Sequence, residues 1–281
     1  MARVEDGAAL DALLATVEDG RDQLTRHFSL IALAEVGGRD PDPAARPEAH
    51  TRIRRALLRE MGRRSSHRSH RSWAALAGAL YARQVPAAAP PVLDALRAGF
   101  REETDPSFRG AFALGLALLD DRPSAGLILS EFRGSRQDDF RGYAGVALGL
   151  LRSEEAADDL LALAEAKSTS PTLRLKTATS LGLLGDPEAV PTLVGQLEEA
   201  ASLESLASAA SSLGLIGDRT AVGPLMSLAG DADGRAATRA FACVALGLLG
   251  ARGELPFNAP LRAHNNYLAQ MPSIAEVLRI L

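Results

Sequence analysis

The chain is poor in aromatic residues and cysteine, and both shortages exclude classes of protein. Only 4% of the 281 residues are aromatic although 47% are hydrophobic, because alanine and leucine fill most apolar positions. This composition suits closely packed helices better than β-sheets, which favour β-branched and aromatic side chains. Cys243 is the only cysteine, so an intramolecular disulfide and a metal centre of several thiolates are both excluded.

Long apolar segments are also missing. No stretch approaches the roughly 20 consecutive apolar residues that a helix needs to cross a bilayer. The first residues carry acidic side chains where a secretory signal would carry a basic segment and then an apolar one. We therefore expect a cytoplasmic protein with no membrane span, unless a signal peptide has been removed.

The common catalytic motifs are absent as well. The sequence contains no H-E-x-x-H, no G-x-S-x-G, no P-loop and no G-x-G-x-x-G. His67 and His70 have the spacing of one helical face, but two histidines without a third ligand make a weak metal site. Cys243 is predicted to be a small, core-facing residue and not a nucleophile. We expect no catalytic residue, no metal and no cofactor.

What the sequence does contain is a short phrase that recurs at an almost constant interval. Leu-Gly pairs follow one another in steps of 34, 33, 32 and 33 residues, beginning at Leu114, Leu148, Leu181, Leu213 and Leu246. A fixed period in this range is typical of stacked helical units, none of which can bury its apolar face alone. The period therefore predicts an all-α repeat protein.

Each unit is expected to be a pair of helices. In one unit Asp186 can cap the first helix and Pro187 suits its first turn. The second helix carries the Leu-Gly phrase and is expected to end at a left-handed glycine, namely Gly185, Gly217 or Gly250.

Glycines also recur inside the second helices, where each costs about 1 kcal/mol relative to alanine. Their recurrence predicts a close approach between helices, at which a Cβ atom would not fit. The positions are Gly115, Gly149, Gly182, Gly214 and Gly247.

The order G-D-P-E-A-V-P-T-L, followed by an arginine, small residues and A-L-G-L-L-G, resembles the HEAT repeat, in particular the short bacterial variety called HEAT-like or phycobilisome-lyase-type repeats. The match is strong over residues 105–250. Over residues 1–104 it is weaker, and the segments that begin at Arg26 and Arg71 resemble degenerate second helices.

The resemblance implies an α-solenoid, a right-handed superhelix of about seven helix pairs with the second helices on its concave side. Residues 251–281, which contain two early prolines and then an amphipathic segment from Pro272, are expected to form a C-terminal capping helix over the apolar end of the stack. The whole chain, residues 1–281, is expected to be a single domain.

A second apolar stripe lies on the second helices, opposite the side predicted to face the stack. Positions are counted from the residue that opens each second helix, seven residues before the leucine of the Leu-Gly pair, such as Arg174 before Leu181. Leucine fills the ninth position in all five units. The predicted concave surface comprises Phe108, Phe112, Leu116, Tyr143, Val146, Leu150, Leu175, Leu183, Leu215, Phe241, Val244 and Leu248. Either curvature or the C-terminal segment covers this stripe, or it binds an apolar or amphipathic protein segment or a second copy of the chain.

One segment is strongly basic in an otherwise acidic chain of net charge −4. Its arginines are Arg52, Arg54, Arg55, Arg59, Arg63, Arg64, Arg68 and Arg71. Such a patch can bind phosphates, and its affinity would then fall with salt. We favour a solvated helix and loop instead, because the overall acidity and the presence of only two lysines argue against a nucleic-acid partner.

An arginine opens several second helices, often after an upstream aspartate: Arg26, Arg141, Arg174 and Arg239. These arginines would form an anion-binding ladder, or they would bridge neighbouring turns, as the family resemblance implies. We favour the bridging role.

We predict a non-catalytic scaffold that binds a protein or peptide along its concave surface. The His-Glu pairs that hold iron in HEAT-repeat hydroxylases are absent. The alternative is a HEAT-like enzyme or binder that acts on a bilin pigment or on nucleic acid, which absorbance of the purified protein would reveal.

Overall fold

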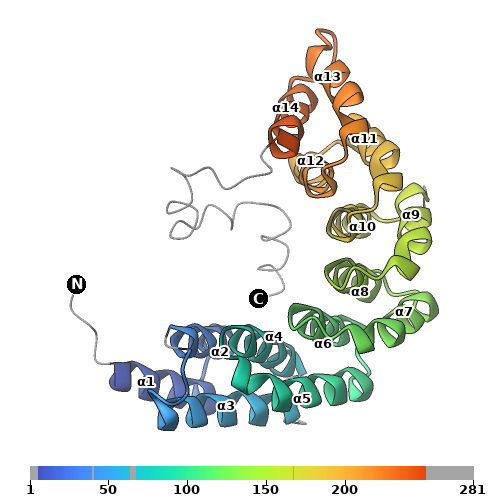
Figure 1. The fold of residues 1–281 in the computed structure, drawn as a ribbon. Helices are drawn as coiled ribbons and strands as arrows, with labels where there is room; N and C mark the ends of the chain where they lie inside the picture. The colour runs from blue at the N-terminus through green and yellow to red at the C-terminus, as the bar shows by residue number, and fades with distance from the viewer. Residues whose placement is uncertain (1–5, 40, 64–67, 167, 251–281) are drawn as a thin grey trace. The chain divides into compact units, whose positions relative to one another are not determined.

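The computed structural model describes residues 6–39, 41–63, 68–166 and 168–250 (Figure 1). Within these ranges the chain forms 14 α-helices and five short 3-10 helices and contains no strand. The helices follow one another as seven pairs, which confirms the predicted all-α solenoid. The predicted C-terminal cap, residues 251–281, lies outside the described residues. No described helix combines the length and apolarity needed to cross a bilayer.

The described part of the chain divides into two compact units, one ending at Ile128 and the other beginning at Leu129. The boundary falls inside α7 (Ala125–Gly134). Each unit has its own layers of helices, and the single domain over residues 1–281 stays a prediction.

The first unit contains two layers of three helices (Figure 1). The first helices of the pairs are α1 (Asp6–Asp19), α3 (Pro47–Gly62) and α5 (Ala89–Glu102). The second helices are α2 (Gln23–Gly38), α4 (Arg68–Gln84) and α6 (Pro106–Leu118). Helix α4 contacts both α2 and α6, and α3 contacts both α1 and α5. The layers meet at fully buried Leu30, Leu57, Leu96 and Phe100.

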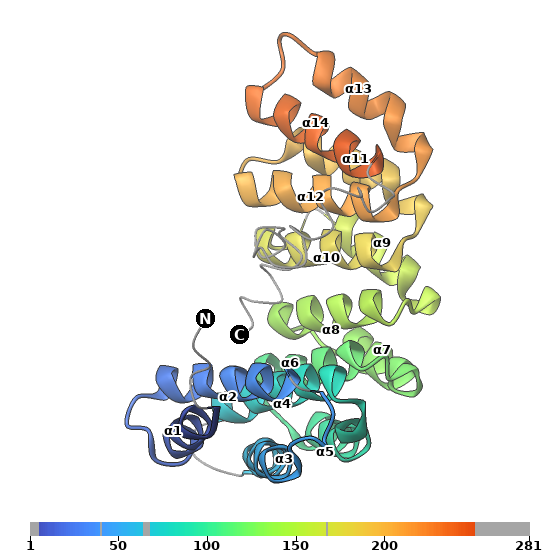
Figure 2. The ribbon, with the colours of Figure 1, turned by 60° about the vertical axis from the view of Figure 1, so that its left-hand side comes forward.

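The second unit repeats this arrangement, and Figure 2 shows its second helices stacked one above another. They are α8 (Asp138–Leu150), α10 (Pro171–Leu184), α12 (Leu203–Ile216) and α14 (Ala236–Gly250). The other layer contains α9 (Ala157–Glu165), α11 (Val190–Glu199) and α13 (Val222–Gly230). Helix α10 contacts α8 and α12, and α12 also contacts α14. Every second helix therefore lies directly against its neighbours in this unit.

Two of the three predicted left-handed glycines are confirmed, whereas Gly250 is the last helical residue of α14 and has no positive φ angle. Gly185 and Gly217 adopt left-handed φ angles of 80° and 66°, and their N–H groups donate to Leu181 and Leu213. Asp186 accepts a hydrogen bond from the N–H of Glu188, but it caps a 3-10 turn, and the α-helix itself begins at Val190.

Two earlier pairs place an ordinary side chain in the left-handed region, where Asp120 has φ 51° and exposed Arg152 has φ 52°. A non-glycine residue costs roughly 1–2 kcal/mol there. We expect Arg152→Gly to raise the free energy of unfolding by up to about 1 kcal/mol, because part of the gain is lost to the greater freedom of glycine in the unfolded chain. Urea denaturation measures this change. Gly185→Ala is the matched control and should lower stability, and a less stable Arg152→Gly variant would contradict the argument.

The arginines that open the second helices bind main-chain carbonyls at the end of the preceding helix. Nε of Arg26 donates to Val17 O at 3.0 Å, and Nε of Arg71 donates to Met61 O at 2.9 Å. Nη1 of Arg239 donates to three carbonyls just after α13. The carbonyl end of a helix carries partial negative charge, so a guanidinium stabilises it. These arginines therefore hold the end of the preceding helix through its carbonyls, and Arg26 and Arg71 also lie near the carboxylates of Glu60 and Glu103.

Candidate interaction surface

The structure shifts the register of α6 by two residues relative to the sequence repeat. Asp105 caps α6 four residues before Arg109, just as Ser170 caps α10 four residues before Arg174. Nε of Arg109 also donates to Phe100 O at 2.9 Å, which is the contact of an opening arginine. The opening position of α6 is therefore Arg109, not residue 107 as the Leu-Gly alignment implied.

This shift corrects the placement of two predicted surface residues. Counted from Arg109, Phe112 and Leu116 occupy positions three and seven, the same positions as buried Thr177 and Leu181 in α10. Phe112 and Leu116 are 0% exposed. They are core residues of the first unit, and the prediction that they lie on an open surface is wrong. Phe108 precedes the opening residue and is half-buried.

In the second unit, exposure depends on whether another helix follows. Position five is buried in α8 and α10, where Val146 is 1% and Thr179 is 2% exposed, but in α14 Val244 is 47% exposed. Val146 is therefore also a core residue. Cys243, which we predicted to face the core, is exposed. Gly145 holds the same position in α8 and lies against Ser180 of α10, the next second helix. Cys243 lies on α14, which is the last second helix that the structure describes, so no described helix follows to cover it.

The leucines at position nine have two different flanks. A Cβ atom on Gly149 would lie 3.1 Å from Cβ of Leu183, and one on Gly214 would lie 2.4 Å from Cβ of Leu248. One flank of Leu183 and of Leu248 therefore fills the space left by a glycine of the preceding helix, whereas Ser212 fills it at Gly182. The other flank remains partly open, so Leu183 and Leu248 are half-buried while Leu215 is 50% exposed.

The remaining predicted surface residues of this unit are half-buried: Tyr143, Leu150, Leu175 and Phe241. Above the Tyr143 ring lies Nζ of Lys176, 3.5 Å from the ring centroid. Lys176 is only 3% exposed, and glycine at position 142 leaves it room, since a Cβ there would lie 2.4 Å from Cδ of Lys176. The ring face of Tyr143 is thus covered by a cation–π contact within the unit.

The basic segment is largely engaged inside the first unit. Arg52 forms an ion pair with Asp11 at 2.6 Å, and Arg59 forms one with Glu18 at 2.7 Å. Arg71 contacts Glu103 at 3.3 Å. Arg54 and Arg55 lie on α3, half-buried and exposed respectively. Arg64 and the side chain of Arg68 lie outside the described residues. These ion pairs support a structural role for the segment.

Glu60 is the centre of a buried charge cluster that the sequence did not reveal. Its fully buried carboxylate lies 3.0 Å from Nε of Arg59, 3.2 Å from Nη1 of Arg63 and 3.1 Å from Nε2 of His70. Burial alone would raise the pKa of Glu60, but hydrogen bonds from His70, Arg59 and Arg63 lower it from 4.5 to about 2. His70 therefore belongs to an ion-pair cluster. His67 lies outside the described residues, which contain no group of three or more metal-binding side chains.

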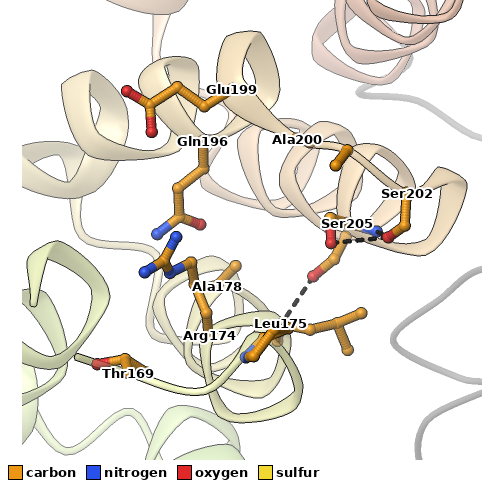
Figure 3. Close-up of a pocket in the computed structure, with 12 residues that line it drawn as sticks. Thr169, Arg174, Leu175, Ala178, Gln196, Glu199, Ala200, Ser202 and Ser205 are labelled. Carbon is orange, nitrogen blue, oxygen red and sulfur yellow. Dashed lines mark hydrogen bonds between the residues drawn. The ribbon is translucent and has the colours of Figure 1, made fainter. Parts of the chain in front are cut away.

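A cavity of about 480 Å³ opens between the N-terminal halves of α10 and α12 and the end of α11 (Figure 3). Leu175 of the predicted surface lines it beside the guanidinium of Arg174. Periodicity could not have predicted this cavity, because three helices from two pairs form it. Its lining residues are Thr169, Pro171, Arg174, Leu175, Ala178, Gln196, Glu199, Ala200, Ala201, Ser202, Ser205 and Ser208.

A comparison with protein families supports the repeat fold. A family model for HEAT repeats matches residues 126–204, from α7 to the first turn of α12. The predicted phycobilisome-lyase-type subtype stays a prediction. No curated protein matches the chain. The structure of human deoxyhypusine hydroxylase in complex with glycerol is 19% identical, and the match covers 87% of this chain and 97% of that chain with a TM-score of 0.37. Such a score carries no argument about function.

Proposed function

Since this chain is a HEAT-repeat protein, we propose that it is a non-catalytic scaffold that binds an apolar or amphipathic segment of a partner protein. The binding surface is the open flank of the second helices in the second unit, and above all α12 and α14. The exposure of Leu215 and Val244 carries this proposal, because large apolar side chains on neighbouring helices mark interaction surfaces when they gather into a patch.

Leu248 joins the apolar side chains of the two helices. Leu248 of α14 packs over Gly214 of α12, and Gly214 directly precedes Leu215 in the sequence. Half-buried Leu183 occupies the equivalent position on α10, which in turn contacts α12. A helical partner segment buries apolar residues along such a row at intervals of three or four residues. A protein partner also suits the acidic chain, whose arginines on α3 already pair with carboxylates.

We expect Leu215→Glu to weaken binding of a partner segment by roughly tenfold or more, because it places a charge in the apolar contact. Peptides selected from a random library against the purified wild-type protein provide the ligands, and calorimetry measures their affinities. The matched control is Met226→Glu on α13, since Met226 is 61% exposed but lies in the other layer. Both variants should retain wild-type helicity and unfolding.

Several outcomes would contradict the proposal. Failure to select any peptide would do so, as would an equal loss of affinity in the Leu215→Glu and Met226→Glu variants. A pigment or nucleic acid that copurifies with the protein, seen by absorbance, would favour the alternative binder or enzyme. A homodimer that dissociates on Leu215→Glu would replace the partner segment by a second copy of the chain.

A further inference from the structure

The opening arginines differ in what their guanidinium groups contact. Among the described residues, Nε of Arg141 is buried without a hydrogen-bond partner, and its guanidinium lies over the ring of Phe132. In α2, α4 and α6 the equivalent Nε atom donates to a helix-end carbonyl at 2.9–3.0 Å. Nε of Arg174 is buried and has no hydrogen-bond partner among the described residues. Its Nη2 atom reaches only the carbonyl of Ala166, at a long 3.4 Å. A buried donor without a partner is costly and calls for an explanation.

Side chains from the cavity wall already donate to two carbonyls at the end of α9, including Ala164 O, which is equivalent to the Met61 carbonyl that Arg71 binds. At the end of α9, the hydroxyl of Thr169 donates to Leu163 O at 2.8 Å. The amide of Gln196, from α11, donates to Ala164 O at 3.2 Å. Thr169 and Gln196 from the cavity wall thus bind carbonyls at the end of α9. The guanidinium of Arg174 lines the cavity beside them (Figure 3).

The rest of the cavity wall also favours a negative group. The first turn of α12 borders it, and Oγ of Ser202 caps that turn by accepting from the N–H of Ser205 at 3.1 Å. The N-terminal end of a helix carries partial positive charge and hydrogen-bond donors. Hydroxyls of Ser202 and Ser205 add polar atoms on the same side. The donors of two neighbouring helices therefore converge on one space.

The charge balance points to a single negative charge. Among the described residues that line the cavity, Arg174 is the one basic residue and Glu199 is the one acidic residue. Glu199 is exposed and its carboxylate points away from the guanidinium (Figure 3). A dianion such as phosphate would be repelled by Glu199 without a second cation to hold it, whereas a carboxylate matches the planar fork of one arginine.

We propose that this cavity binds a carboxylate, namely an acidic side chain of the partner segment, through the guanidinium of Arg174. The inference rests on the proposed function and extends it. Leu175 belongs to the predicted surface and also lines the cavity, so an acidic residue of a segment bound to that surface can reach Arg174. The partner is then an amphipathic segment that combines apolar anchors with at least one aspartate or glutamate.

The first test uses the full chain and a small carboxylate. The Nε–H resonance of Arg174 in an NMR spectrum is identified by its loss in the Arg174→Gln variant. Sodium glutarate should shift this resonance saturably, while sodium chloride at the same ionic strength should not. Arg109, whose Nε is engaged, provides the internal control and should not respond. Glu199→Gln should lower the half-saturating glutarate concentration by about twofold, because it removes a nearby like charge. A non-saturating or chloride-like response of Arg174 overturns the site.

The second test separates this inference from the proposed function. Peptides selected on the wild-type protein should contain an acidic residue, and its replacement by the amide should weaken binding about tenfold. The same replacement should have no effect on the Arg174→Gln variant. If peptides bind but glutarate does not, the carboxylate site fails alone. If glutarate binds but no peptide is selected, the scaffold proposal fails and the cavity is a site for a free carboxylate.

Discussion

Replacement of Gly182 by alanine is expected to lower the free energy of unfolding by about 2–3 kcal/mol, because the new methyl group meets main chain that cannot move aside. Its Cβ atom would lie 2.6 Å from Cα and 2.7 Å from Cβ of Ser212 on the neighbouring α12. Alanine gains about 1 kcal/mol in helix propensity, which only partly offsets this overlap. Urea denaturation followed by circular dichroism measures the change.

The control is the equivalent glycine of the last described second helix. A Cβ atom on Gly247 would have no neighbour within 4 Å among the residues that the structure describes. Gly247→Ala should therefore raise the free energy of unfolding by up to about 1 kcal/mol through helix propensity alone. Wild-type stability in the Gly182→Ala variant would contradict the close helix contact. A destabilised Gly247→Ala variant would show that α14 is covered in the same way as the other second helices.

The second large effect concerns Glu60, whose carboxylate should stabilise the first unit in a pH-dependent manner. Its pKa is about 2 in the folded protein against an ordinary value of 4.5. Because the folded pKa is the lower one, the stabilisation is fully present above pH 4.5 and is lost as the pH falls through about 2. The difference corresponds to about 3 kcal/mol. Fluorescence of Trp73, the only tryptophan, follows unfolding of this unit because its ring stacks on His27 in the fold.

Glu60→Gln tests the same cluster at neutral pH. The amide leaves Arg59, Arg63 and His70 without their shared anion, so stability should fall by about 3–5 kcal/mol. The variant should also lose the dependence on pH described above. Glu18→Gln is the matched control, because Glu18 pairs with the same Arg59 at the surface, where such a pair contributes less than about 1 kcal/mol. A Glu60→Gln variant that retains the wild-type acid dependence would assign the effect to another carboxyl group.

The sequence alone determined the helix pairs, their number and their close approach. These features depend on local signals, namely the Leu-Gly period, the left-handed glycines and the internal glycines. Each signal affects the structure within a few residues of its own position in the sequence. Gly149 and Gly182 were predicted to mark close contacts, and a Cβ at either would approach the next helix to 2.5 or 2.6 Å. Periodicity predicted these contacts because every unit repeats them.

Tertiary structure decided which members of the repeat are open. The cap at Asp105 starts α6 two residues later than the Leu-Gly alignment implied, and this turns Phe112 and Leu116 into core residues. Leu215 and Val244 are exposed, whereas Leu183, the equivalent of Leu215, is half-buried and Val146, the equivalent of Val244, is buried. Arg174 lines a cavity, and Gln196 of another helix pair occupies the Ala164 carbonyl, which is equivalent to the one that Arg71 binds. These outcomes depend on side chains from different helix pairs that meet only after folding, so no period in the sequence could predict them.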